Sequence, residues 1–586
     1  MKRYLLASAI IITFVPFKAQ AVQIDAAGAD HLKKVFTNLL NDQKEINEAF
    51  GTVDVIYTGE VAVEPKGEYY AVTLPKVEIK LDESLAAQVP PPAPQDPAQA
   101  QQTPPPAPGA NGFVLDLGQT AINAIPDEKP GNWKMTVALP ATLSMKIADE
   151  MAININIGQQ NTAGLFNESY GYFTKMDALY KDLKFNVVSA GQTHDFAIPE
   201  LSMKSNLEDE GGYLTGPTTI RASGLAFDIP EEHASIKLGA LQVDAGLKKY
   251  KALPSGEYKA KMIAYGQKLK TMIDNPSAPP SGAQIEEIVN SVLGFSDFEG
   301  MDVRYSLENL DIAANPPQDD FKPGEDLKGL KIAGAFLGFG LDQIKSESGT
   351  VSFNFGYNDV AVDPIPPGYE GIIPNAVNLG FTANKIPMQS LWTNGMNSVK
   401  AISANPEMGA MAGMGLLMQL PMMLTNAGTE ITVKDNFVRG PEYKAALDGT
   451  VKADASAAMQ FISSFKGQFD GLDELLTKVQ ANANNPNFPN AYEFNDIAMT
   501  LQSMKDMGQA GTGADGKSSY AFDIQVGADG KATINGKDIP MGGMGGAPMG
   551  GPGMPPPGME QPAAPPAQSP DNQTPAAGDE GQPLPY

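Results

Sequence analysis

The most constraining feature of the chain is a strand-like alternation of apolar residues that runs up to a proline and continues beyond it. In most copies the alternation changes parity at the proline, as at Pro75, Pro199 and Pro230, whereas at Pro140 it keeps its phase. Successive strand side chains point to opposite faces, so one extra residue in a β-bulge keeps apolar residues on one face. Each proline therefore predicts a bulged strand or a strand end, and in both cases a sheet that bends. The copies are TLPKVEIKL (73–81), ALPATLSMKI (138–147), AIPELSMK (197–204), DIPEEHASIKL (228–238) and the weaker KIPMQSL (385–391).

Alternating runs of this kind occupy most of the chain and predict a mainly β (α+β) fold. We expect one or more large, curved antiparallel sheets with bulged strands, a few helices packed on one face and a disordered C-terminal tail. The expected regions are a signal peptide (1–21), a helix with strands (22–85), a Pro/Ala/Gln-rich linker (86–112), a β-rich region (113–245), a helical insertion (246–297), a second β-rich region (298–387), a Met-rich helical segment (388–428), an α+β region (429–539) and a disordered Met/Gly/Pro-rich tail (540–586).

The N-terminal residues predict export. Lys2 and Arg3 precede a short apolar stretch, and Ala19-Gln20-Ala21 supplies the small-x-small pattern of a signal peptide cleaved after Ala21. An uncleaved anchor is the alternative, although the stretch is short for a membrane span. We therefore expect a periplasmic protein of a Gram-negative cell that does not span the membrane after cleavage. The chain has no cysteine, so it has no disulfide or thiolate ligand.

The net charge of the chain is strongly negative. The formal charge of −26 repels nucleic acid at long range, so we expect no nucleic-acid partner. The one candidate basic patch is expected on a helical segment, where it is typical of a solvated helix face. Its members are Lys248, Lys249, Lys251, Lys259, Lys261, Lys268 and Lys270.

Catalytic and metal-binding motifs are sparse. His194 beside Asp195 could form a general base with an orienting carboxylate, but we interpret it as a polar residue on a strand. Ser463 and Lys466 match S-x-x-K without its companion motifs, and the G-x-G-x-x-G match at 511–516 lacks the strand–loop–helix context of a phosphate site. We predict no enzyme, no cofactor and no metal site. A hydrolase for envelope polymers with a spatially assembled carboxylate pair remains an alternative.

The segment MGAMAGMGLLMQLPMML (408–424) permits three interpretations. As a membrane helix it is short and is interrupted by Gln419 and Pro421. As a Cu(I) site its thioethers are suitable, but no His or Cys joins them. As apolar surface it requires burial, because its glycines and proline disfavour an exposed helix. We predict burial in the core or along a hydrophobic groove. The residues expected to line that groove are Met411, Met414, Met418 and Met422.

Three blocks of sequence support a family resemblance. They are VDVIYTGEVAVEP with EYYAVTLPKVEIKL, then IPNAVNLGFTANKIPMQSLW, and then FDGLDELLTKVQ with YAFDIQVGADGKATINGKDI. Together they resemble uncharacterised exported alphaproteobacterial proteins of the YdgA-like and AsmA-like β-rich envelope type. The resemblance implies a large antiparallel structure in the cell envelope, and AsmA-like proteins are associated with lipid handling.

The sequence thus predicts a non-enzymatic periplasmic envelope protein. It would bind or carry a hydrophobic, lipid-like ligand in a curved β groove, or scaffold an envelope partner. The alternatives are a methionine-based Cu(I)-binding protein and the hydrolase named above.

Overall fold

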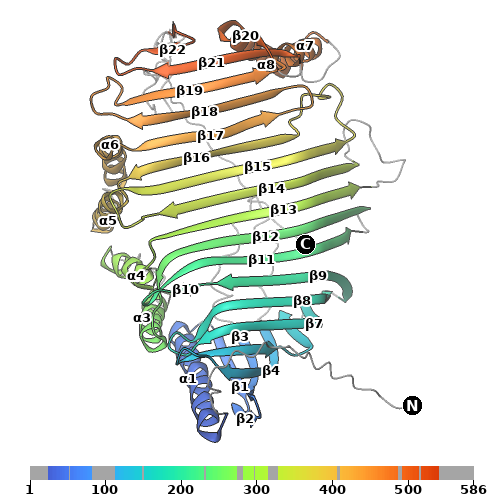
Figure 1. Cartoon of the computed structure of the whole chain (residues 1–586), viewed down its shortest axis with the longest axis vertical. Helices are drawn as coiled ribbons and strands as arrows, with labels where there is room; N and C mark the ends of the chain where they lie inside the picture. The colour runs from blue at the N-terminus through green and yellow to red at the C-terminus, as the bar shows by residue number, and fades with distance from the viewer. Residues whose placement is uncertain are drawn as a thin grey trace, which may run out of the picture. The chain divides into compact units, whose positions relative to one another are not determined.

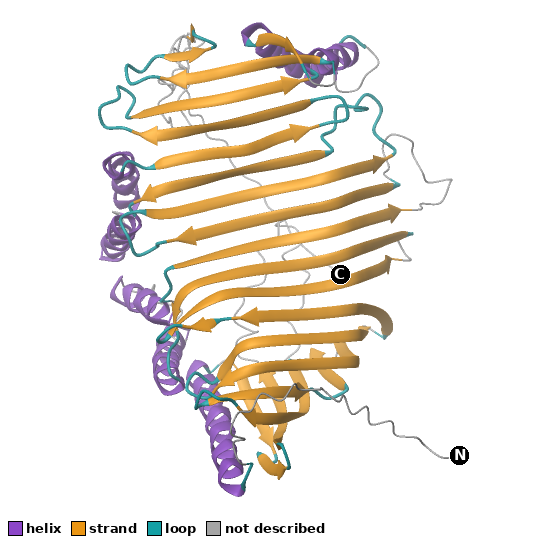
Figure 2. Cartoon of the chain, in the orientation of Figure 1, coloured by secondary structure: helices purple, strands orange, loops and turns teal. Residues whose placement is uncertain are grey.

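The computed structural model describes residues 24–51, 53–81, 113–147, 151–189, 191–229, 233–273, 282–295, 297–314, 328–404, 409–485, 491–513 and 516–539. The expected signal peptide, Pro-rich linker and C-terminal tail lie outside these residues. The described residues confirm a mainly β fold in which 23 antiparallel strands form one sheet (Figure 2).

The N-terminal half of the sheet contains twelve strands. Most strands pair with the next one along the chain, but β3 pairs with β1, β2 and β4, and β9 pairs with β8 and β11. The strands are β1 (Val53–Thr58), β2 (Ala62–Lys66), β3 (Tyr69–Leu81), β4 (Val114–Pro126), β5 (Asn132–Ala138), β6 (Thr142–Ile147), β7 (Met151–Asn167), β8 (Tyr172–Ser189), β9 (Gln192–Asn206), β10 (Glu208–Asp209), β11 (Tyr213–Ile229) and β12 (Ala234–Lys251).

The C-terminal half continues the same antiparallel order, with β19 pairing with β18 and β21. A final hairpin across Asp529-Gly530 joins β21 and β22. The strands are β13 (Gly300–Ala314), β14 (Gly329–Asp342), β15 (Gly349–Asp363), β16 (Ala376–Ile386), β17 (Glu430–Arg439), β18 (Lys444–Ala453), β19 (Phe461–Asp470), β20 (Gln509–Thr512), β21 (Ser518–Val526), β22 (Ala532–Ile534) and β23 (Lys537–Ile539).

Seven helices are described, close to where the sequence predicts them. The first helix begins at Ala26, because the Asp25 carboxylate caps it by accepting a hydrogen bond from the Gly28 amide at 2.8 Å. The helices are α1 (Ala26–Phe50), α3 (Ser255–Ile273), α4 (Gly282–Phe295), α5 (Met388–Ala404), α6 (Gly409–Ala427), α7 (Leu472–Ala483) and α8 (Ala491–Met507).

The helices occupy two kinds of position. Helix α1 packs on the face of the first strands, and α7 with α8 packs on the last strands. Helices α3, α4, α5 and α6 follow one another along one edge of the sheet, at the strand ends (Figure 1). The prediction that helices pack on one face is therefore confirmed for α1, α7 and α8 only.

The core beneath α1 shows why this end of the sheet is stable. Leu32 of α1 is fully buried against Tyr70, Trp133 and neighbouring apolar side chains. The Glu168 carboxylate accepts a hydrogen bond from Trp133 Nε1 at 3.1 Å and lies 2.9 Å from His31 Nε2. This contact ties the helix to the strands through polar as well as apolar groups.

A line of irregular residues crosses eight strands from β7 to β15, and we call it the seam. At the seam one residue of each strand is missing from the regular antiparallel pairing with the neighbouring strands. These residues lie opposite one another in register. Every second member has a positive φ, between 52° and 73°. Because the side-chain parity flips there in every strand, apolar residues stay on one face. The members are Gly158, Asp182, Pro199, Gly224, Gly239, Asn309, Ala333 and Asp359.

The prolines of the repeated pattern therefore differ in their roles. The bulge is confirmed at Pro75, where the register shifts inside β3. Pro199 belongs to the seam, where the strand continues and its parity flips, but its pairing with β8 keeps one register and therefore contains no extra residue. Pro230 itself lies outside the described residues, between the end of β11 at Ile229 and the start of its partner β12 at Ala234. At Pro140 the strand is interrupted between β5 and β6, and the Gln160 side chain bonds both the amide and the carbonyl of Leu139. Pro387 precedes a helix.

The seam gives a testable prediction at Gly224. Its φ is +73°, and an added Cβ would lie 3.0 Å from Pro199 Cγ. We expect Gly224→Ala to lower the free energy of unfolding by about 1–3 kcal/mol, since left-handed backbone and crowding both oppose the methyl group. Urea denaturation followed by circular dichroism measures this change.

Gly395→Ala is the matched control. Gly395 lies inside α5, and an added Cβ there meets no atom within 4 Å. We expect that variant to gain about 0.5–1 kcal/mol from helix propensity. If both alanines had the same effect, the seam would not require its glycine.

Candidate functional site

One face of the sheet is lined by apolar side chains in continuous rows. Directly paired residues of antiparallel strands point to the same side, so the register traces each row. One row crosses β11 to β16 and the next crosses β12 to β16. We call this side the apolar face. The first row is Ile220, Val243, Tyr305, Leu337, Phe355 and Leu379, and the second is Ala245, Val303, Phe339, Phe353 and Phe381.

The two ends of the apolar face are covered and its middle is open. At the first end Met135 and Phe166 are buried under α1, and at the last end Phe469 and Tyr520 are buried under α7 and α8. Between them each strand from β11 to β18 has a large apolar side chain that is 36–48% exposed. These residues are Ile220, Leu241, Tyr305, Phe339, Phe355, Leu379, Phe381, Ile431 and Leu447.

The open middle is wide for an exposed apolar surface. Eight strands at about 4.8 Å spacing span about 34 Å. A soluble monomer rarely exposes a contiguous apolar patch larger than a few hundred Å², and larger patches mark sites for apolar partners. Apart from Tyr305, the two rows consist of hydrocarbon side chains. Such a surface can hold an apolar chain by removing it, and the side chains beneath it, from water.

The opposite face has a different character, with charged and amide side chains between the same strands. The Arg221 guanidinium bonds both Glu308 carboxylate oxygens, at 2.9 and 2.6 Å, and also bonds Gln242 at 2.7 Å. Hydrogen bonding to Arg221 holds the pKa of Glu308 below its usual range. We call this side the polar face. Because charged and amide side chains lie on the polar face, an apolar partner is expected to bind on the apolar face.

Two tyrosines on or near the apolar face, Tyr357 and Tyr443, have a raised pKa. Burial raises the pKa of Tyr357. Burial, with a smaller effect of Tyr357, raises the pKa of Tyr443 to about 12, and its hydroxyl donates a 2.8 Å hydrogen bond to the Ile372 carbonyl. These side chains therefore add no charge to the apolar face at neutral pH.

The predicted methionines do not form a closed core. Met414, Met418 and Met422 are 59–78% exposed, and the side chain of Met411 lies outside the described residues. Burial in the core is therefore wrong for these three residues. Whether they line a groove stays a prediction.

Helix α6 forms because its other side is supported. Leu420, Met423 and Leu424 are half-buried, and the Asn394 amide of α5 lies 3.5 Å from Met423 Sδ. This contact with α5 supports the helix despite its glycines and Pro421.

The candidate catalytic pairs are not brought together. His194 and Asp195 are neighbours on β9, so their side chains point to opposite faces, and Asp195 accepts a 2.7 Å hydrogen bond from Asn186. On β19, Ser463 pairs with Val526 of β21, and Lys466 pairs with Asp523 of β21. Ser463 and Lys466 are three positions apart on one strand, so their side chains also point to opposite faces. Neither pair has the geometry of a base with its partner.

Five lysines of the candidate basic patch form ion pairs with carboxylates. Lys248, Lys249 and Lys251 belong to β12 rather than to a helix, which corrects the prediction. Lys248 lies 2.8 Å from Asp342, and Lys249 lies 2.6 Å from Glu299. On α3, the side chains of Lys259, Lys261 and Lys268 also form ion pairs, with Asp42, Glu257 and Glu287 respectively.

The described residues contain neither a cluster of metal ligands nor a helix that could span a membrane. No three side chains of His, Cys, Asp or Glu gather in them as a metal site would require. Within the same ranges, no helix is both long and apolar enough to cross a bilayer.

Comparison of the chain with protein-family models, with curated proteins and with solved structures gives no match. The resemblance to YdgA-like and AsmA-like envelope proteins therefore stays a prediction.

Proposed function

We propose that the protein binds a hydrophobic, lipid-like ligand on the open middle of its apolar face, without catalysing a reaction, in the periplasm of a Gram-negative cell. The single observation that supports this function is the row of large apolar side chains, 36–48% exposed, on every strand from β11 to β18. The location follows from the signal-like N-terminal residues.

An acyl chain suits the dimensions and chemistry of this surface. The open middle spans about 34 Å across the strands. One acyl layer is about half as thick as the ~30 Å hydrocarbon core of a bilayer, so an extended acyl chain fits within this span. The rows contain aliphatic and aromatic side chains without a charged group, so an acyl chain that covers them removes no charged group from water. The covered ends confine such a ligand to the middle.

The test is a titration of the full chain with a fluorescent diacylglycerol, whose headgroup has no charge to be repelled by the −26 of the protein. We expect saturable binding, and we expect organic extraction of the purified protein to release lipid that mass spectrometry detects. If the titration shows no saturable binding and no lipid co-purifies, the proposed function is wrong.

A further inference from the structure

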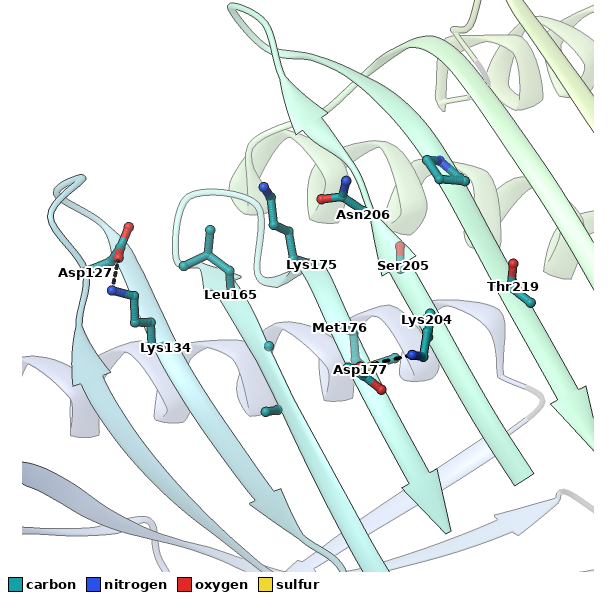
Figure 3. Close-up of a pocket in the computed structure, with 13 residues that line it drawn as sticks. Asp127, Lys134, Leu165, Lys175, Met176, Asp177, Lys204, Ser205, Asn206 and Thr219 are labelled. Atoms are coloured by element: carbon teal, nitrogen blue, oxygen red, sulfur yellow. Dashed lines mark ion pairs between the residues drawn. The ribbon is translucent and has the colours of Figure 1, made fainter. Parts of the chain in front are cut away.

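A second candidate site lies on the polar face, at the N-terminal part of the sheet. There a hollow of about 560 Å³ opens above β5, β7, β8, β9 and β11 (Figure 3). Its size is in the range of small-molecule pockets. Lys134, Lys175 and Lys204 all line it, which is unusual in a chain with a net charge of −26.

The register explains why these lysines share one side. One row runs Lys134, Leu165, Lys175, Asn206 across β5, β7, β8 and β9. The next row places Lys204 between Asp177 and Thr219. Trp133 and Met135, the neighbours of Lys134 along β5, are buried on the opposite side under α1. The hollow is therefore separate from the apolar face.

The three lysines differ in how strongly their ammonium groups are paired with carboxylates. Lys134 Nζ lies 3.0 Å from Asp127, whose carboxylate is only 16% exposed. Lys204 Nζ lies 3.5 Å from Asp177, and both side chains are at least 65% exposed, so that pair is weak. Lys175, between them, has no ion-pair or hydrogen-bond partner among the residues that the structure describes. The ammonium groups of Lys175 and Lys204 are therefore available to bind an anion.

The spacing allows the lysines to converge on one ligand. Lys134 and Lys175 are two strands apart, about 10 Å between Cα atoms. Lys175 and Lys204 are diagonal neighbours on adjacent strands, about 7–8 Å apart. Lysine stems span such distances, and Figure 3 shows Lys175 beside Asn206, whose amide can donate to the same anion.

The side-chain chemistry selects the class of anion. The lining of the hollow contains no arginine, whose planar fork would bind two oxygens of one anion, so its positive charge comes from lysines on separate stems. Separate ammonium groups act as point charges and suit the several oxygens of a phosphate. A smaller hollow of about 270 Å³ shares Asp127, Leu165 and Lys175 with this one, which leaves space for the group that carries the phosphate.

We propose that this hollow binds a phosphomonoester, with Lys175 and Lys204 as its principal ligands. The proposal does not depend on the proposed function, because the two sites lie on opposite faces. Asp177 competes with the anion for Lys204, so removing its charge strengthens binding.

The test is calorimetric titration of the full chain with inorganic phosphate at low ionic strength. We expect Lys175→Gln to weaken binding at least tenfold and Asp177→Asn to tighten it about threefold. The matched controls are Lys181→Gln, on the same strand but paired with Glu200, and Asp311→Asn on β13. Both controls are expected to stay within twofold of the unmodified chain.

Vesicles distinguish the two sources of such a phosphate. Competition with phosphate by phosphatidic acid in phosphatidylcholine vesicles identifies a lipid headgroup, whereas competition only by soluble sugar phosphates identifies a free metabolite. Either result supports the site. Equal affinities of Lys175→Gln and Lys181→Gln would overturn it, as would the absence of phosphate binding.

Discussion

Replacing Phe494 by alanine is expected to lower the free energy of unfolding by about 3–5 kcal/mol. Phe494 is 1% exposed and packs edge-on against Tyr369, with 5.2 Å between ring centroids. It lies in the cluster that joins α7 and α8 to the last strands. The cavity left by the ring cannot close without moving Leu472 or Val479, which are both fully buried. Urea denaturation followed by circular dichroism measures the change.

Phe339→Ala is the matched control, because it removes the same ring from the open middle of the apolar face. Phe339 is 48% exposed, so we expect a loss of about 1.5 kcal/mol or less. Similar losses at the two positions would mean that the middle of the face is covered, contrary to the structure.

Phe339→Asp is expected to weaken diacylglycerol binding at least tenfold. Phe339 lies in the second apolar row, between Val303 and Phe353. A carboxylate at that position must lose water when a lipid covers it, and it has no basic partner in the row. Tenfold corresponds to about 1.4 kcal/mol, a modest part of that desolvation penalty.

Asn358→Asp provides the comparison for this second prediction. Asn358 lies opposite Gly334 on the polar face, so its substitution adds the same charge on the other side of the sheet. We expect lipid affinity to stay within twofold of the unmodified chain. An equal loss in both variants would show that net charge, and not the apolar face, controls binding.

Much of the fold could be predicted from the sequence, because local patterns determine it. Alternation identified the strands, Pro75 marked a real bulge, and Pro199 marked a position of the seam where the side-chain parity flips. The other members of the seam were not predicted. Asp182 and Asn309 disturb their strands without a proline, and only pairing with neighbouring strands shows that they lie on one line.

The candidate site could not be predicted in the same way. The alternating apolar residues of β13 to β15 are visible in the sequence, but whether a helix covers them depends on where α5 and α6 pack. Helices at the strand ends leave residues such as Phe355 exposed. The number of long alternating runs, compared with the few amphipathic helices, is the signal that would have indicated an uncovered face. The prediction that the methionines of α6 are buried failed for a related reason, because the support of α6 by α5 is not visible in the sequence.

The most direct test of the central claim is photo-crosslinking of the full chain to a diacylglycerol with a photoreactive group in its acyl chain. Mass spectrometry then locates the modified residues. We predict modification of apolar-face residues on β11 to β18, such as Leu241, Phe339 and Leu379, with none at Gln242 or Asn354 on the polar face. Modification concentrated on the polar face or on α6, with the apolar face unlabelled, would contradict the account.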